Sequence, residues 1–248
     1  MNSVYFVLGT PGSGRRAIVR DLIENGLAAE DRALVLLAEG EAADPADARL
    51  AGLPNAEVRR WTWHEPALPP VELPPGATVF LLADSLASPI DQLEALKPWL
   101  AEHGATLARV FCVVDCSLAE KQPVLRQWFD ACIHFADVVF LTHREGLANK
   151  WLSDFIKHYT HERFPCHFVQ VKAKGDLATP LVWLDPTARR VSQYFDEDET
   201  YEIEGLETDD EEDEEDTGLL PPEPYFVRLG NGRREKIVPV LRDYLPKK

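Results

Sequence analysis

Short apolar runs alternate with amphipathic stretches along most of this chain. Each run has the length and the predominantly apolar character of a β-strand, and the run at 33–37 is continuously apolar, as a strand covered on both faces would be. The predicted strands are residues 4–8, 33–37, 78–83, 109–114, 137–141 and 167–171. Helical patterns follow several of them, at residues 15–25, 90–102, 118–135 and 147–159. This alternation predicts an α/β fold with a doubly wound, mostly parallel sheet.

The segment between the second and third of these runs has a different composition. Residues 38–76 are rich in Ala, Pro and charge, and a proline cluster at 66–75 favours an extended connection. Residues 58–63 are interpreted as a short additional strand. Its two tryptophans, Trp61 and Trp63, fall on one face, and packing against the core is preferred over partner binding for them.

Charge divides the chain into three parts. The formal net charge is −16, but residues 196–216 hold 15 Asp or Glu and no Lys or Arg, which leaves 27 acidic against 26 basic residues elsewhere. We therefore expect an α/β domain at 1–190, an acidic, disordered linker at 191–222 and a C-terminal hairpin extension at 223–248. In that extension, two apolar runs about Gly230-Asn-Gly232 predict a β-hairpin. The nearly neutral body shows no basic footprint for nucleic acid, while the acidic segment is a candidate surface for a protein partner.

The cysteines and the hydropathy pattern indicate the cellular compartment of the protein. The chain opens directly into a predicted strand, and no apolar run approaches the ~20 residues of a membrane span. We expect a cytoplasmic protein with free thiols. Cys112 with Cys116, and Cys132 with His134, are spaced like metal ligands. A cysteine inside a strand is usually a small core residue, however, and no metal site is predicted.

A glycine-rich loop joins the first strand to the first helix. It reads Gly9-Thr-Pro-Gly-Ser-Gly-Arg-Arg16, and its glycines match the phosphate-binding pattern G-x-x-x-x-G-K-[ST]. Gly9, Gly12, Ser13 and Gly14 are the residues expected to bring backbone N–H groups to phosphate oxygens. The sequence thus predicts a P-loop, and residues 1–190 are expected to form a P-loop NTPase-like α/β domain with a ligand site at the carboxyl ends of the strands.

The two residues that end this loop depart from the pattern. Arg15 replaces Lys and keeps its positive charge as a planar fork. Arg16 replaces the Ser or Thr whose hydroxyl ligates Mg²⁺ in working enzymes. An arginine cannot ligate a cation and would repel it, although it could neutralise phosphate directly. We therefore expect phosphate binding from this loop more than hydrolysis, with an unliganded inherited turn as the alternative.

Three further stretches resemble the CobW-like P-loop GTPases, in the order and spacing of that family. They are Phe80-Leu-Leu-Ala-Asp-Ser-Leu-Ala-Ser-Pro-Ile-Asp91, Phe111-Cys-Val-Val-Asp115 and His134-Phe-Ala-Asp-Val-Val-Phe-Leu-Thr-His-Arg-Glu145. With the loop, the resemblance covers about residues 3–175. It implies that Asp84 takes the place of the acidic residue that orients metal or water, as the catalytic candidate. It also implies that Thr142 to Glu145 face the base of a nucleotide.

The departures from that family concern its chemistry. Leu86 stands where the family has its switch glycine, and Thr142-His-Arg-Glu145 stands where it has the guanine-reading Asn-Lys-x-Asp. No cysteine precedes Cys112, so the family's Cys-x-Cys-Cys metal motif is absent. Asp84 still permits a water-mediated Mg²⁺ contact, which Arg16 opposes.

Two functions remain open from the sequence. The first is a degenerate CobW-like protein that binds GTP or ATP and is at most a weak NTPase. The second is a pseudo-GTPase scaffold that acts through protein contacts without nucleotide. A small-molecule kinase is disfavoured because no Arg-rich lid segment is recognisable. Relatives of this class often form homodimers, and this chain is a candidate for the same assembly.

Overall fold

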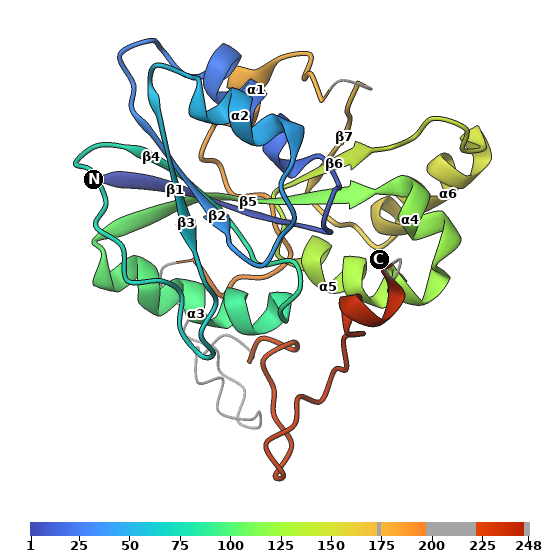
Figure 1. Cartoon of the computed structure of the whole chain (residues 1–248). Helices are drawn as coiled ribbons and strands as arrows, with labels where there is room; N and C mark the ends of the chain where they lie inside the picture. Colours follow the sequence, from blue (N-terminus) through green and yellow to red (C-terminus); the bar gives the residue numbers. More distant parts are fainter. Residues whose placement is uncertain (173–174, 197–221, 246–248) are drawn as a thin grey trace, which may run out of the picture.

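A parallel sheet forms the centre of the computed structural model, which describes residues 1–172, 175–196 and 222–245. Among these residues, seven strands are hydrogen-bonded in the order β3-β2-β4-β1-β5-β6-β7 (Figure 1). They are β1 (Asn2–Gly9), β2 (Ala33–Ala38), β3 (Ala56–Trp61), β4 (Thr78–Leu82), β5 (Ala105–Asp115), β6 (Val138–Thr142) and β7 (His167–Gln170). Every neighbouring pair is parallel, as the apolar runs predict.

Helices cover both faces of this sheet. They are α1 (Arg15–Gly26), α2 (Pro45–Ala51), α3 (Pro89–Glu102), α4 (Cys116–Lys121), α5 (Arg126–His134), α6 (Asn149–His161) and α7 (Pro180–Trp183). One core cluster lies between the sheet and α1, α2 and α7, and a second lies beneath α3, α5 and α6. In Figure 1, α1 and α2 lie above the sheet and α3 and α5 below it. The doubly wound α/β prediction is therefore confirmed, with the P-loop NTPase-like arrangement.

Two helices differ from the sequence-based expectation. The helix expected over residues 118–135 is interrupted, because Gln122 precedes Pro123 and adopts a non-helical conformation (φ −125°, ψ 75°). A short 3-10 turn then leads into α5. Helix α2 was not predicted at all. It begins with a capping box, in which Asp44 accepts from Ala46 N and Asp47 accepts from Asp44 N.

The strand order places a crevice at the end of β1. The chain leaves β1 for β2 and β3 on one side of the sheet, and continues through β5, β6 and β7 on the other. Ligands of open α/β sheets bind at such a switch point, outside the carboxyl ends of the strands. The glycine loop after β1, the end of β4 and the end of β6 all lie at this edge.

The C-terminal segment forms a tight turn that docks on helices. Arg228 and Arg234 form an antiparallel bridge around the turn, and Leu229 N donates to Arg233 O. Phe226 stacks on Phe135 at the end of α5, and Arg234 pairs with Asp91 of α3. The expected hairpin is thus reduced to one bridge, and it lies on α3 and α5 rather than on the sheet.

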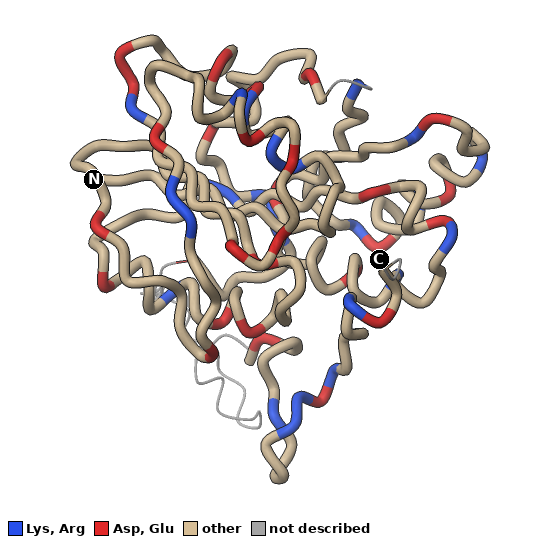
Figure 2. Tube along the Cα trace, viewed as in Figure 1, with Lys and Arg blue, Asp and Glu red and all other residues tan. Residues whose placement is uncertain are grey.

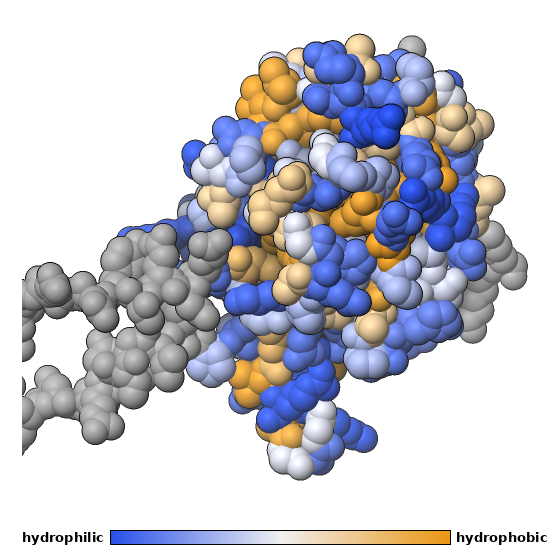
Figure 3. All heavy atoms as spheres, turned by 90° about the vertical axis from the view of Figure 1, so that its left-hand side faces the viewer, coloured by the Kyte–Doolittle hydropathy of each residue, from blue (hydrophilic) through white to orange (hydrophobic). Residues whose placement is uncertain are grey.

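The surface of the C-terminal segment is mainly basic and hydrophilic. Lys and Arg gather along it near the turn (Figure 2). The turn projects at the bottom of Figure 3, where hydrophilic residues predominate, and hydrophobic residues on that face lie scattered between hydrophilic ones. The predicted acidic linker lies outside the described residues, apart from its two ends. No helix in the described part of the chain is long and apolar enough to cross a membrane.

Candidate functional site: a P-loop closed by an ion network

The glycine loop has the backbone that its sequence requires. At Gly9 (φ +149°) an added Cβ would lie 2.8 Å from the carbonyl oxygen of Val113 and 2.9 Å from Cδ of Arg15. Gly14 (φ +88°) precedes α1 in the left-handed conformation, which glycine adopts without steric cost. Ser13 N donates to Thr10 O and closes the turn. The loop therefore passes closely around the start of α1.

Several donors of the loop are free to bind an anion. Within the described residues, no acceptor satisfies the backbone N–H groups of Gly12, Gly14, Arg15 and Arg16. Such groups at a helix N-terminus attract phosphate, carboxylate or sulfate. The hydroxyls of Thr10 and Ser13 are also buried without a hydrogen-bond partner among the described residues. The backbone thus retains the anion-binding capacity that the glycine pattern predicts.

The side chain of Arg15 is directed into the protein. It is 3% exposed and donates to the carbonyl oxygens of Val7 (3.3 Å) and Ala83 (2.7 Å), at the ends of β1 and β4. Its other terminal nitrogen pairs with the Glu41 carboxylate. The positive charge that a P-loop lysine would bring to phosphate is therefore already paired with a residue of this chain.

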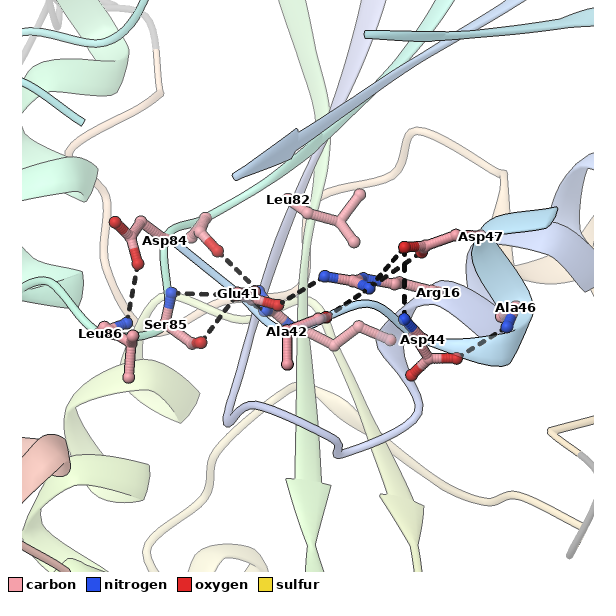
Figure 4. A network of polar contacts seen from close by, with 12 residues as sticks. Arg16, Glu41, Ala42, Asp44, Ala46, Asp47, Leu82, Asp84, Ser85 and Leu86 are labelled. Carbon is pink, nitrogen blue, oxygen red and sulfur yellow. Dashed lines mark hydrogen bonds and ion pairs between the residues drawn. The ribbon is translucent and has the colours of Figure 1, made fainter. Parts of the chain in front are cut away.

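The side chain of Arg16 is also paired with acidic residues of this chain. Its Nη1 donates to both carboxylate oxygens of Asp47, at 2.9 Å each, and to the carbonyl oxygen of Ala42 at 3.0 Å. Its Nη2 lies 3.3 Å from Glu41 Oε2. Figure 4 shows its guanidinium between the two carboxylates. Arg60 of β3 also donates to Asp47, at 2.8 Å, so that this carboxylate joins the loop to the sheet edge.

Glu41 is the centre of the network. Besides both arginines, it accepts from the hydroxyl and the backbone N–H of Ser85, at 2.7 and 3.2 Å. Burial raises the pKa of this carboxyl, but the charge of Arg15 and the hydrogen bonds from Ser85 and Arg15 outweigh burial and lower the pKa below its ordinary value. Glu41 is thus a carboxylate at neutral pH, and it links the glycine loop to the end of β4 (Figure 4).

Neither Glu41 nor Asp47 is identified as a site residue by the sequence. Asp47 carries a local signal, since Asp44-Pro-Ala-Asp47 has the spacing of a capped helix start. Glu41 carries none, because a single acidic residue in an irregular segment follows no periodicity and matches no motif. Only the three-dimensional return of residues 39–47 across the loop reveals its place.

The space left above the loop is small. A cavity of about 100 Å³ is lined by Pro11, Gly12, Gly14, Arg15, Arg16, Glu41, Ala42, Ala43 and Asp44. Pockets for nucleotides and other small molecules usually measure about 300–1,000 Å³. In this conformation, residues 41–44 cover the loop and leave room for a small group only.

Asp84 lies two residues after the end of β4 but faces away from the loop (Figure 4). Its Oδ1 accepts from the N–H of Leu86 at 2.9 Å, and the side chain of Gln92 bonds both its N–H and its carbonyl oxygen. Its neighbour Ser85, rather than Asp84 itself, reaches the network through Glu41. Asp84 is therefore at the expected edge of the sheet, without a contact to the loop among the described residues.

The segment after β6 lies beside the loop, and its side chains divide into two groups. The hydroxyl of Thr142, the last residue of β6, is buried, and its one proton is shared between the carbonyl oxygens of Ser13 (2.8 Å) and Val114 (3.0 Å). Arg144 donates to Gln170 and to the carbonyl oxygen of Val171. Thr142 and Arg144 therefore have structural roles, because their side chains bond to other segments of this chain. His143 (φ +47°) lies 2.8 Å from Asp115, and Glu145 is exposed, so these two remain accessible to a ligand.

The cysteines lie in the core. All four are free and buried, and burial raises the pKa of the Cys116 thiol to about 12. In the part of the chain that the structure describes, no group of three or more His, Cys, Asp or Glu residues is arranged to hold a metal ion.

A larger cavity, of about 780 Å³, lies far from the loop. It is formed by α3, His134 at the end of α5, residues 191–194 and residues 222–227. It contains none of the predicted phosphate-binding or catalytic residues, although His134, which has metal-ligand spacing to Cys132 in the sequence, lines it.

Comparison with known proteins gives a likeness in fold only. No family model matches this chain, and no curated protein matches it either. Among solved structures, it is similar to the Zn(II)-bound YjiA GTPase from E. coli and to a Zn(II)-bound triple mutant of that GTPase. Each shows 16% identity and a TM-score of 0.38, and the match covers 72% of this chain. The matched part spans 61% of the length of those chains.

Proposed function

We propose that this chain is a degenerate P-loop protein, resembling the CobW-like GTPases, which binds the phosphates of GTP or ATP and hydrolyses them weakly or not at all. The observation that carries the proposal is the state of Arg16. It stands where a hydrolytic P-loop has its metal-binding hydroxyl, and it is buried in ion pairs with Asp47 and Glu41. The N–H groups of the loop and of the first turn of α1, which have no acceptor among the described residues, would donate to the phosphate oxygens.

The residues present do not fit Mg²⁺. In P-loop NTPases, the Ser or Thr hydroxyl of the loop and an acidic residue after the neighbouring strand hold the metal between them. Here the first position carries a guanidinium, which donates hydrogen bonds and has no lone pair to offer. The proposed binding therefore depends on backbone N–H groups and arginine charge.

The remaining site residues have proposed roles of unequal weight. Asp84 would orient water, once freed from its bond to Leu86 N. Glu145 is exposed three residues after the end of β6 and would accept from the N–H groups of a base. The hydroxyl of Thr142 is engaged with Ser13, so its contribution would be to position the loop. This distribution supports ligand binding better than turnover.

The second candidate is a scaffold that binds no nucleotide. It is favoured by the internal neutralisation of Arg15 and Arg16, which removes the charge that a P-loop normally offers to phosphate. A scaffold would bind a cytoplasmic protein partner through the acidic segment and the docked C-terminal turn, or form a homodimer.

Thermal denaturation with GTP, ATP, GDP and ADP, each with and without Mg²⁺, separates the two. A ligand at 100 times its dissociation constant stabilises the folded state by about 2.7 kcal/mol. We expect a stabilisation that does not depend on Mg²⁺. No shift at millimolar concentration would contradict the nucleotide proposal and support the scaffold.

A pair of glycine variants provides the control. Gly14→Ala places a side chain at φ +88° in the loop, and Gly232→Ala places one at φ +81° in the C-terminal turn, and neither Cβ would meet an atom closer than 3.8 Å. Both changes introduce the same kind of backbone strain. Only the loop variant should lose the nucleotide-dependent shift.

A further inference from the structure

The P-loop already contains an anion of its own. The carboxylate of Glu41 is 7% exposed and pairs with Arg15 and with Arg16, the two cations that follow the loop glycines. It also takes the two donors of Ser85, after β4. In P-loop NTPases, phosphates and their metal lie between the loop and the end of this neighbouring strand. A carboxylate provides the same chemistry there, negative oxygens that accept from guanidinium, hydroxyl and backbone N–H.

We propose that Glu41 is the specificity-determining residue of this loop, an internal counter-anion that a polyphosphate must displace in order to bind. This inference rests on the proposed function. The ligand would not enter an open site but would replace the carboxylate of Glu41. The free-energy cost of breaking the contacts of Glu41 would then lower the affinity for every ligand.

The surroundings of Glu41 allow it to move. It lies in an irregular segment between β2 and α2, and its neighbours Gly40, Ala42 and Ala43 are exposed. The cavity of about 100 Å³ lies directly beneath this segment and extends to Gly12 and Gly14 of the loop. Rotation of residues 40–43 outward would widen that cavity without changing a strand or a helix.

Displacement would free one arginine more than the other. Arg16 keeps its two bonds to Asp47, which is anchored on α2 and by Arg60. Arg15 would keep only the carbonyl oxygens of Val7 and Ala83. The guanidinium of Arg15 is therefore the group that becomes available to a ligand.

The exchange also selects the class of ligand. Orthophosphate carries a charge between about −1 and −2 at neutral pH, and its single phosphoryl group would do little more than replace the Glu41 carboxylate. A diphosphate or triphosphate brings more charge and a second set of oxygens, which would reach the N–H groups of Gly12, Gly14 and Arg16. We therefore expect pyrophosphate and nucleoside diphosphates to displace Glu41 better than orthophosphate does.

The test compares Glu41→Gln with the unchanged chain, by calorimetric titration with pyrophosphate, orthophosphate and GDP. Glutamine keeps the shape of the side chain and an oxygen for Ser85, but carries no charge. Affinity for pyrophosphate and GDP should rise at least tenfold. Glu57→Gln, which breaks an exposed pair with Arg59 on the far edge strand, is the matched control and should leave affinity unchanged.

Each outcome decides one of the two proposals. Equal binding by both proteins would overturn the role of Glu41 and leave the proposed function standing. Absence of binding by both proteins at millimolar concentration would overturn the proposed function, and the competition with it.

A second variant covers the case in which Glu41→Gln fails to fold. Ser85→Ala removes the hydroxyl that holds Glu41 and leaves every charge in place. It should raise pyrophosphate affinity severalfold, and an unchanged affinity in this folded variant would also overturn the proposal.

Discussion

The hydroxyl of Thr142 lies 2.8 Å from the carbonyl oxygen of Ser13, so that the end of β6 is bonded to the glycine loop after β1. The same hydroxyl lies 3.0 Å from the carbonyl oxygen of Val114 on β5. Three segments of the crevice therefore meet at one buried donor. This contact explains why a residue expected to face a nucleotide base is instead buried beneath the loop.

Thr142→Val should destabilise the protein and loosen the loop. Valine keeps the shape of threonine but leaves two buried carbonyl oxygens without their donor, a loss of about 1–2 kcal/mol in the free energy of unfolding. Urea denaturation measures it. Thr142→Ser restores the donor and should recover most of the loss. Equal stability of the valine and serine variants would show that the hydroxyl contributes nothing.

Arg16→Thr recreates the residue type of a hydrolytic loop but should not recreate its chemistry. The change leaves the largely buried carboxylates of Glu41 and Asp47 without a cation that both share. Breaking such a pair costs about 3 kcal/mol or more. We therefore expect a destabilised protein with no gain in Mg²⁺-dependent GTP or ATP hydrolysis, measured by denaturation and by phosphate release.

The double variant Arg16→Thr with Asp47→Asn isolates the pair. If the cost comes from the stranded carboxylate, the double variant should lose less stability than the two single losses added together. Arg59→Ala removes an exposed arginine from the same edge of the sheet and should change stability little. Strict additivity would contradict the ion-pair explanation.

The sequence predicts the fold of this chain well because the central strands, β1, β2, β4, β5 and β6, are buried on both faces. Six continuous apolar runs coincide with strands of the sheet, and the pattern Gly9-x-x-x-x-Gly14 identifies the loop, since few residues tolerate its backbone. Burial of a strand and the geometry of a tight loop each constrain residues that are close together in the sequence. Both features can therefore be predicted from a short stretch of sequence.

The ion network that covers the glycine loop could not be predicted from the sequence. Glu41 reaches Arg15 across 26 positions, and Ser85 reaches Glu41 across 44. Such a network depends on where an irregular segment returns, which no periodicity encodes. The double arginine did indicate a departure from metal-dependent chemistry, but the carboxylates that neutralise it are visible only in three dimensions.

Acid should weaken the network in a predictable direction. The pKa of Glu41 in the folded protein lies below its value of about 4.3 in an unfolded chain. Its contribution to stability is therefore complete above that value, and is lost as pH falls through the lower folded value. Urea denaturation between pH 3 and 7 should show Glu41→Gln less stable than the unchanged chain at neutral pH, with the difference narrowing in acid. A difference that does not vary with pH would contradict the assignment of charge to Glu41.

His143 offers a separate test at the accessible side of the crevice. Its Nδ1 lies 2.8 Å from Asp115 Oδ2, and this hydrogen bond raises the pKa of the imidazole above its usual value of about 6.5. Partial burial lowers the pKa but does not cancel the effect, and the charges of Asp115 and Glu145 raise it further. The pair therefore stabilises the folded chain fully below about pH 6.5, and the stabilisation fades as pH rises through the raised value.

An NMR titration of the His143 ring protons measures this directly. Asp115→Asn removes the charge but keeps an oxygen to accept from Leu118 N at the start of α4, so the helix cap survives. The pKa of His143 should fall in this variant. Glu162→Gln, which removes a carboxylate beside His158 on α6, should leave the His143 titration unchanged. A His143 pKa that stays the same in the Asp115 variant would show that the carboxylate does not control this histidine.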